Sequence, residues 1–177
     1  MFIDFRIGVM KKPPPRPQLP PRLSNNDKRK LLQAPDAALI QTLAAQAHYV
    51  GSSKHKQWPH LFGLPPFNGR RGDATLCDAH AGFTPAQMAT VAQLIQRGIT
   101  AGLVGHCGLI WTVADNGWIF EARLTNPQQA EYHGYPVRDS EPIAECVYRR
   151  FAAWAEQNGS TAHNHAAAMC RDLYGFK

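Results

Sequence analysis

Alternating apolar and polar residues predict a β-hairpin in the middle of the chain. Two strand-like runs, 109–114 and 118–125, flank Asp115-Asn116-Gly117, three residues that tolerate the positive φ angles of a tight turn. Because side chains alternate between the two faces of a strand, Glu121 and Arg123 are expected side by side on one face. The residues expected to face the core from the same strand are Trp118, Phe120, Ala122 and Leu124.

Apolar residues at helical spacing predict four helices, which cover residues 35–48, 84–98, 142–157 and 160–173. The second helix has the clearest start, because Thr84 is a good N-cap, Pro85 suits the first helical position and Gln87 completes a capping box. Gly98 is expected to end this helix.

Short strands and one long loop complete the predicted elements. Tyr49-Val50 and the segment 132–137 have strand character, and residues 57–82 form a loop rich in proline and glycine. A loop this long in a compact domain is usually functional or a covering flap. The order helix, short strand, loop, helix, hairpin, strand, helix, helix predicts a small α+β domain with a mainly antiparallel sheet packed by helices.

Charge divides the chain into two parts. Residues 1–32 contain eight Lys/Arg and two Asp, whereas residues 33–177 contain eleven of each sign, so the net charge of +6 belongs to the N-terminus. The run 11–22 is proline-rich and favours an extended polyproline II conformation. We therefore expect a basic, Pro-rich arm or linker over residues 1–33 and a single α+β domain over 34–177. The arm suits nucleic acid or an acidic partner, and a solvated, solubilising arm is the alternative.

The cellular location is predicted from what the chain lacks. No apolar run in the 177 residues is long enough for a membrane span, and the basic residues near the N-terminus follow the apolar ones, unlike a signal peptide. The four cysteines are irregularly spaced, as is usual for reduced thiols. The chain is therefore expected in the cytoplasm, with no membrane partner.

Two polar stretches hold most of the side chains that can perform chemistry: 49–56, and 120–126 continued by 131–136. RNA cleavage without a metal needs a base for the 2′-hydroxyl proton, an acid for the leaving oxygen and a cation for the phosphate. His55 and His133 suit the first two tasks, and Glu121 is able to replace either. The residues expected to bind phosphate or base are Arg123, Lys54, Lys56, Ser52 or Ser53, Tyr132 and Tyr135. No metal and no cofactor are expected.

Each of these residues has a simpler interpretation. Glu121 and Arg123 are two positions apart on a strand and make a plausible surface ion pair. His55 lies between two lysines and fits a solvated loop, whereas His133 precedes a glycine and fits a turn. The catalytic hypothesis depends on both stretches meeting on one sheet.

Zinc is the main competing chemistry. Cys77, His80, His106 and Cys107 together offer two thiols and two imidazoles. His106 and Cys107 are adjacent, however, which is awkward for tetrahedral ligation by both, and a second pair with the usual spacing is missing. His163, His165 and Cys170 are a further metal-binding alternative to a surface histidine pair.

The combined motifs resemble a family of small uncharacterised bacterial proteins. The residues that carry this resemblance, across about residues 48–137, are Tyr49-Val50-Gly51-Ser52-x-x-His55-Lys56, Arg70-x-x-Asp73-Ala74-x-x-Cys77, Glu121-Ala122-Arg123-Leu124-Thr125-Asn126 and Glu131-Tyr132-His133-Gly134-Tyr135-Pro136. That family has no assigned activity, so this resemblance implies no chemistry.

The element order and residue chemistry also resemble, more broadly, toxin nucleases of the barnase–EndoU–colicin–RelE group. Those proteins pack N-terminal helices on a small antiparallel sheet that carries His, Lys, Arg and Glu or Tyr on its face. The resemblance implies that His55, Lys56, Glu121, Arg123 and His133 are the site. It further implies a toxin–antitoxin or phage-defence setting, with a neutralising antitoxin protein or a nucleic-acid-containing complex such as a retron as partner.

Three hypotheses follow from the sequence. The first is a toxin-like, metal-independent ribonuclease that binds RNA and uses His55 and His133 as acid and base. The second is a non-catalytic module that binds nucleic acid or protein through its basic arm. The third is a toxin that modifies a nucleotide such as NAD through Tyr49, Tyr132 and Glu121.

Overall fold

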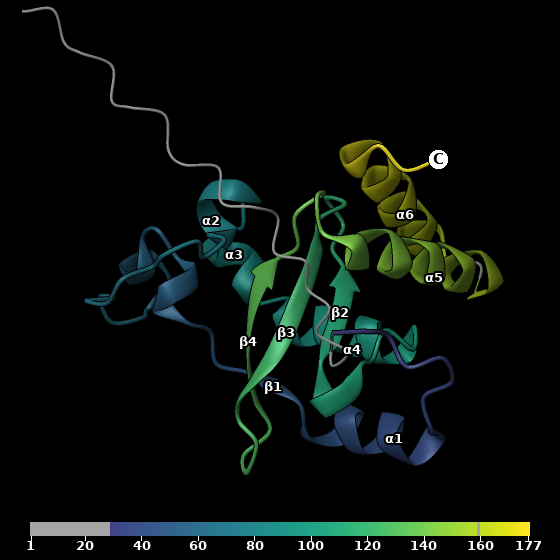
Figure 1. The fold of residues 1–177 in the computed structure, drawn as a ribbon, viewed down its shortest axis with the longest axis horizontal. Helices are drawn as coiled ribbons and strands as arrows, with labels where there is room; N and C mark the ends of the chain where they lie inside the picture. The colour runs from purple at the N-terminus through teal and green to yellow at the C-terminus, as the bar shows by residue number, and fades with distance from the viewer. Residues whose placement is uncertain (1–28, 159) are drawn as a thin grey trace, which may run out of the picture.

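A computed structural model describes residues 29–158 and 160–177 of the chain (Figure 1). The six α-helices of this part are α1 (Ala37–Gln46), α2 (Cys77–His80), α3 (Pro85–Met88), α4 (Val91–Thr100), α5 (Pro142–Asn158) and α6 (Thr161–Tyr174). Its four strands are β1 (His48–Tyr49), β2 (Ile110–Val113), β3 (Ile119–Asn126) and β4 (Glu131–Pro136). Three short 3₁₀ helices are η1 (Ser53–His55), η2 (Pro59–Phe62) and η3 (His106–Gly108).

The four strands form one sheet in the order β1-β4-β3-β2. The pairs β2–β3 and β3–β4 are antiparallel, and the predicted hairpin is confirmed with Val113 opposite Ile119. The short edge strand β1 runs parallel to β4, so the sheet is mixed rather than purely antiparallel. The structure thus confirms a small α+β fold with a mainly antiparallel sheet.

Both faces of the sheet are covered, by different helices. On one face Trp111, Val113 and Ile119 pack against α5 and α6, whose apolar side chains complete a buried core. On the other face α4 packs on β2, with Phe120 and Ala122 contributing to a second core. Helices α5 and α6 lie together on one side of the sheet in Figure 1, and α1 lies beside α4.

The sequence pattern assigned one face of β3 to the core, but both faces are buried in the first half of the strand. Ile119 and Glu121 are both fully buried, although they lie on the face opposite the predicted core face. The side chain of Arg123 is 43% exposed, and Thr125 is exposed, so the same face opens in the second half of β3. The reason is that α5 and α6 cover only part of this face.

The helix predicted over residues 84–98 is interrupted. The Thr84–Gln87 capping box is present, but α3 ends at Met88 and α4 continues past Gly98 to Thr100. Gly98 does not end the helix, because its role is close packing. A Cβ at this position would lie 2.1 Å from the carbonyl oxygen of Trp111 in β2. Only glycine permits α4 to approach the sheet so closely.

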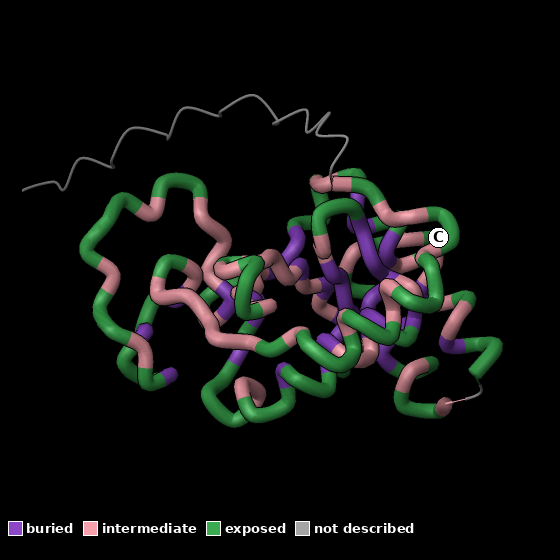
Figure 2. The backbone as a smooth tube through the Cα atoms, turned by 90° about the horizontal axis from the view of Figure 1, so that it is seen from below, coloured by how far each residue is buried: buried purple, intermediate pink, exposed green. Residues whose placement is uncertain are grey.

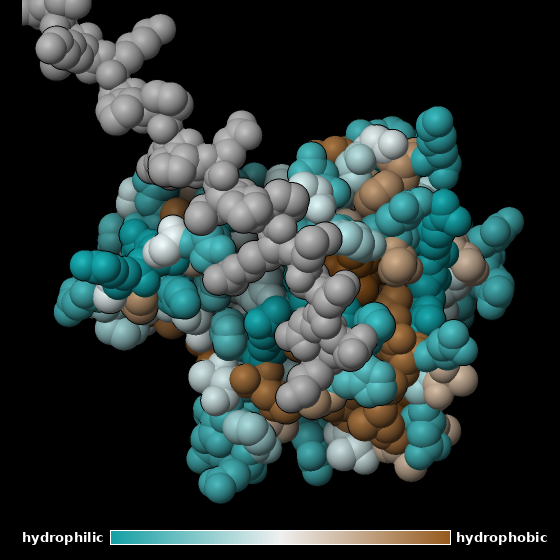
Figure 3. Space-filling view, viewed as in Figure 1, coloured by the Kyte–Doolittle hydropathy of each residue, from teal (hydrophilic) through white to brown (hydrophobic). Residues whose placement is uncertain are grey.

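The ends of the first helix and the long loop also differ from prediction. Asp36 is the N-cap of α1, with its carboxylate accepting a hydrogen bond from the Ala38 amide, so the helix begins at Ala37 rather than at residue 35. The loop 57–82 contains η2 and α2. Residues 57–76 are mainly exposed and project from the sheet in Figures 1 and 2, and this projection is largely hydrophilic on the face seen in Figure 3.

Most of the predicted basic arm, residues 1–28, lies outside the described residues. The last residues of the predicted arm, from Arg29 onward, are described and contact the domain. Leu31 bridges to Gly105, and the Leu32 amide donates a hydrogen bond to the Val104 carbonyl oxygen at 2.8 Å. Arg29 reaches the middle of the sheet, as described below. Among the described residues no helix combines the length and apolar character needed to cross a bilayer.

Candidate functional site

The pairing register of β3 and β4 gathers four polar side chains on one sheet face, which is buried around Glu121 and opens toward Arg123. Glu121 is opposite Tyr135 and Arg123 is opposite His133. Directly opposed residues share a face, and residues two apart along a strand do so as well. The sequence prediction that Glu121 and Arg123 lie together is confirmed, and His133 and Tyr135 join them.

Helix η1 brings His55 onto this group. The His55 ring stacks on His133 with a centroid distance of 5.5 Å and an interplanar angle of 12°. It also stacks on Tyr135 at 5.0 Å and 23°. The two polar stretches of the sequence therefore meet, as the catalytic hypothesis requires. The simpler interpretation of His55 as a solvated loop residue is wrong.

Hydrogen bonds fix both imidazole rings. Nδ1 of His55 lies 3.1 Å from the carbonyl oxygen of Thr75, which can only accept. In the neutral ring Nδ1 therefore carries the proton, and Nε2 keeps the lone pair that a general base needs. Nδ1 of His133 lies 2.7 Å from the hydroxyl of Thr125.

The buried carboxylate of Glu121 accepts hydrogen bonds from its neighbours in this group. Its Oε2 accepts from Nε of Arg29 at 2.6 Å and from Nε1 of Trp111 at 2.9 Å. Its Oε1 accepts from Nε of Arg123 at 2.6 Å and from the hydroxyl of Tyr135. Four donors thus surround a carboxylate whose side chain is completely buried.

This environment keeps Glu121 ionised. Burial by itself raises its pKa, but Arg29, the Tyr135 hydrogen bond and Arg123 outweigh burial and hold the pKa below its ordinary value. A carboxylate with a low pKa and four donors is a poor proton acceptor. The geometry therefore does not suit Glu121 as a replacement for either histidine, and it suits a carboxylate that orients its neighbours.

Arg123 and Lys54 supply positive charge beside the two rings. The guanidinium carbon of Arg123 lies 5.2 Å from the Tyr135 ring centroid, so the group stacks on the ring while Nε is held by Glu121. Lys54 is the exposed middle residue of η1. Both cations act on the two histidines, as the pKa shifts below show. Together they can bind a phosphate.

Both histidines are biased toward the neutral form. Burial, followed by the nearby His55 ring, Arg123 and Lys54, lowers the pKa of His133 to about 4. Burial also lowers the pKa of His55, assisted by Lys54, Lys56 and Arg123 and opposed by the hydrogen bond to Thr75. A bound anion would offset these cations and raise both pKa values. The site therefore favours the binding of a negatively charged ligand.

Four of the predicted substrate-binding residues lie elsewhere or are otherwise engaged. Lys56 is completely buried and points into the interior, where it does not reach a ligand on the open face. Tyr132 is buried on the opposite face and donates its hydroxyl to the Gly108 carbonyl oxygen at 2.9 Å. The Tyr135 ring is in the site, but its hydroxyl is bound to Glu121. Ser52 precedes η1, and its carbonyl oxygen accepts from the His55 amide.

The residues of the zinc alternative do not assemble. Cys77 contacts Lys56, and Nδ1 of His80 accepts from the Leu76 amide at 2.9 Å. His106 and Cys107 are exposed on η3. In residues 29–158 and 160–177 no three His, Cys, Asp or Glu side chains are grouped as metal ligands.

Sequence reasoning missed four residues of the site: Arg29, Thr75, Trp111 and Thr125. Trp111 could have been predicted from the sequence. Extending the strand pairing outward from the hairpin turn places Trp111 opposite Glu121. Thr125 follows from the same alternation that places Arg123. No signal in the sequence indicates that Arg29 or Thr75 crosses to this sheet, since both arrive through irregular segments.

No protein-family model matches the chain, and comparisons with curated proteins and with solved structures find no match. Both resemblances drawn from the motifs therefore stay predictions, and function has to be argued from the site alone.

Proposed function

We propose that the protein is a toxin-like, metal-independent ribonuclease whose proton transfers are made by His55 and His133. The observation that carries this proposal is the stacked histidine pair beside two cations on the open part of the sheet face. Two imidazoles next to a phosphate-binding arginine are sufficient for RNA cleavage by transfer to the 2′-hydroxyl.

In this reaction the 2′-oxygen attacks the adjacent phosphorus, and the bond from phosphorus to the 5′-oxygen breaks. One histidine takes the proton from the 2′-hydroxyl, and the other gives a proton to the leaving 5′-oxygen. The products are a 2′,3′-cyclic phosphate and a free 5′-hydroxyl. Arg123 and Lys54 stabilise the charge that develops on the phosphoryl oxygens.

The surrounding residues support this division of tasks. Glu121 orients Arg123 and Tyr135 through the bonds described above, so it is a positioning residue rather than a catalytic one. The carbonyl oxygen of Thr75 fixes the His55 tautomer.

The biological setting belongs to the same proposal. A ribonuclease located in the cytoplasm would meet cellular RNA there and would need restraint by a neutralising antitoxin protein or a nucleic-acid-containing complex. The basic, proline-rich N-terminus, with six of the net positive charges of the chain, suits contact with such a partner or with RNA. A toxin–antitoxin or phage-defence role follows from this combination.

The proposal is tested by inducible expression in a bacterial host, with growth and total RNA followed. The variants are His55→Asn and His133→Asn, since an asparagine amide can replace the hydrogen bond made by Nδ1 but cannot transfer protons at neutral pH. The matched control is His165→Asn, an exposed histidine on α6. We expect growth arrest with RNA fragments for wild type and control, and neither effect for the two site variants.

Other outcomes support other functions. Arrest with intact RNA and falling NAD would favour a nucleotide-modifying toxin. An RNA-binding activity that both site variants retain, and that deletion of residues 1–28 removes, would favour a non-catalytic binding module. Either result would overturn the ribonuclease proposal.

A further inference from the structure

Lys56 and Cys77 form a buried pair that the proposed reaction does not use. Lys56 directly follows His55 in sequence, yet its side chain points into the core and is completely buried. Its Nζ lies 2.7 Å from Sγ of Cys77, which is 3% exposed. Sγ of Cys77 lies 3.2 Å from the carbonyl oxygen of His55 and donates the thiol hydrogen to it.

The nitrogen–sulfur separation is shorter than an ordinary hydrogen bond to sulfur permits. Sulfur is a large atom, and 2.7 Å lies well inside the sum of the nitrogen and sulfur van der Waals radii. The other contacts of the Lys56 nitrogen are the ring faces of Phe62 at 4.8 Å and Phe83 at 5.1 Å. These contacts recover only part of the hydration lost on burial, so a change that removes the charge is favourable.

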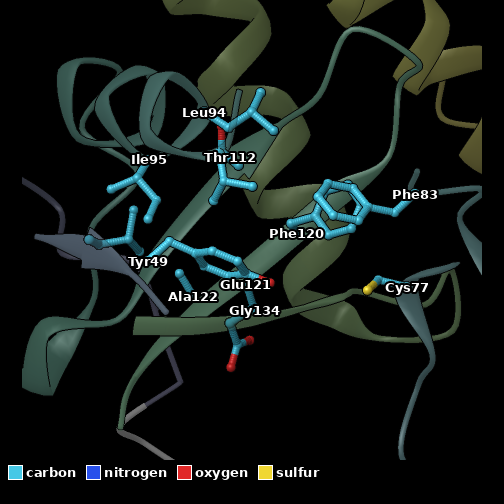
Figure 4. Close-up of a pocket in the computed structure, with 12 residues that line it drawn as sticks. Tyr49, Cys77, Phe83, Leu94, Ile95, Thr112, Phe120, Glu121, Ala122 and Gly134 are labelled. Atoms are coloured by element: carbon cyan, nitrogen blue, oxygen red, sulfur yellow. The ribbon is translucent and has the colours of Figure 1, made fainter. Parts of the chain in front are cut away.

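A small oxidant can reach the sulfur from an apolar pocket. Cys77 lines a small cavity of about 40 Å³ whose other walls are mainly apolar, including Phe83, Leu94, Ile95 and Phe120 (Figure 4). In Figure 4 the Cys77 sulfur points toward this cavity from its edge. Dioxygen is small and apolar and partitions into such a space without losing hydrogen bonds to water.

We propose that Lys56 and Cys77 are a covalent modification site, at which dioxygen joins Nζ to Sγ through one oxygen atom in a nitrogen–oxygen–sulfur bridge. The Lys56 ammonium group first loses one proton to water, and then the S–H bond of Cys77, one N–H bond of the resulting amine and the O–O bond break. An S–O bond and an O–N bond form, and the second oxygen atom leaves as water with the two released hydrogens. Sulfur and nitrogen are each oxidised by two electrons, and dioxygen accepts all four.

The environment selects this pair among the cysteines of the chain. Cys170 is equally buried, but it lies on α6 and faces a core of apolar side chains, and burial raises its pKa to about 12. Cys107 and Cys146 are exposed and meet solvent oxidants without a fixed amine at contact distance in the described structure. Within residues 29–158 and 160–177, only Cys77 combines burial, an adjacent lysine nitrogen and a wall of the apolar pocket.

The bridge changes the segment that carries His55. It removes the thiol hydrogen that Cys77 donates to the His55 carbonyl oxygen, and it links the chain after η1 to the first residue of α2. Closing this loop covalently restrains the unfolded chain and stabilises the fold. The bridge forms whether or not the site cleaves RNA, so the two proposals succeed or fail separately.

The test is intact-mass spectrometry of the full chain with Cys107→Ser and Cys146→Ser, which removes the exposed thiols. One sample is kept anaerobic with dithiothreitol and another is equilibrated with oxygen-saturated buffer. Both are denatured without further reductant and alkylated with iodoacetamide. We expect the oxygenated protein to take up one alkyl group fewer and to be heavier, before alkylation, by one oxygen less two hydrogens.

Peptide mapping then locates the change. We expect trypsin not to cleave after Lys56, the peptides of Lys56 and Cys77 to stay linked, and dithiothreitol to reverse both effects. Lys56→Arg and Cys77→Ser are each expected to abolish the mass change, whereas Lys54→Arg, a neighbouring exposed lysine, keeps it. In the protein that carries only Cys107→Ser and Cys146→Ser, the oxygenated form should melt roughly 5–10 °C higher than the reduced form.

Two results overturn the proposal. One is complete alkylation of Cys77 after oxygenation, with no mass change. The other is a gain of one whole oxygen on Cys77 with normal cleavage after Lys56, which is a sulfenic acid and not a bridge. Both results are read from the protein that carries only Cys107→Ser and Cys146→Ser, so they do not depend on whether the Lys56 and Cys77 variants fold.

Discussion

Two side chains of opposite charge are buried completely in this protein, and their surroundings differ. Glu121 receives four hydrogen bonds, two of them from arginines, in the middle of the sheet. Lys56 contacts one sulfur atom and two aromatic ring faces. His55 contacts both regions. Its ring stacks on Tyr135, which is bound to Glu121, and its carbonyl oxygen accepts from Cys77, the residue that Lys56 contacts.

The difference shows what each charge does. A buried charge whose hydrogen bonds are all made organises its neighbours, because each neighbour is held by a strong, charge-assisted bond. Glu121 thereby fixes Arg123 and Tyr135, the surface on which His55 rests. A buried charge with few polar contacts holds less in place and gains from losing its charge. Lys56 is therefore the better candidate for chemical change, and Glu121 for permanent architecture.

The largest expected effect is on stability, from Glu121→Ala. This change leaves two buried or half-buried guanidinium groups, an indole N–H and a phenol without their common acceptor. We expect the free energy of unfolding to fall by about 3–5 kcal/mol, measured by urea denaturation. The matched control is Glu145→Ala on α5, which removes an exposed pair with Arg149. That control should cost no more than about 0.5 kcal/mol, and equal losses for the two variants would contradict the role given to Glu121.

A smaller effect is expected from acid. Below about pH 6.5 the unfolded chain protonates its histidines, whereas the folded protein resists protonating His133 until its pKa of about 4 is reached. The unfolded state thus binds more protons in this window, and stability falls as the pH is lowered from 6.5 toward 4.

His133→Asn removes this part of the pH dependence. Allowing for screening by solvent, we expect wild type to lose about 1–2 kcal/mol more than His133→Asn between pH 6.5 and 4, measured by urea denaturation at each pH. Identical pH profiles for the two proteins would show that burial and the neighbouring Arg123 and Lys54 do not lower the pKa of His133.

The smallest effect is expected from Lys56→Met. Methionine keeps most of the lysine volume and its contacts with Phe62 and Phe83, and it removes the cost of burying an ammonium group. We expect the unfolding free energy of the reduced protein to stay within about 1 kcal/mol of wild type. A loss of about 3 kcal/mol or more would make Lys56 as structural as Glu121 and remove the contrast between them.

The sequence predicted the fold better than the burial of individual residues. The period of two on β3 placed Glu121 and Arg123 on one face, and the turn at Asp115-Asn116-Gly117 set the hairpin. It did not show that this face is half covered, because that depends on how α5 and α6 dock. Gly98 illustrates the same limit, since a glycine at a helix end and a glycine at a close contact look alike in sequence.

The site was predictable only in part, for a related reason. His133, Arg123 and Tyr135 follow from strand alternation, and the same alternation excludes Tyr132, which lies on the opposite face. Lys56 and His55 are adjacent in a 3₁₀ turn, where no simple period assigns one to the surface and the other to the core. Arg29 lies in a region that the charge pattern assigns to the arm, so its bond to Glu121 had no local signal.

The central claim is that the His55–His133 pair cleaves RNA through the 2′-hydroxyl without a metal. It is tested most directly by incubating the purified full chain with a short RNA in EDTA, beside the same RNA with one 2′-deoxy residue at the cleavage position. We expect the all-ribose strand to give 2′,3′-cyclic phosphate ends, the substituted strand to remain intact at that position, and His55→Asn and His133→Asn to be slower by about 10²–10⁴-fold. Cleavage of both strands at equal rates, or undiminished cleavage by the two variants, would contradict it.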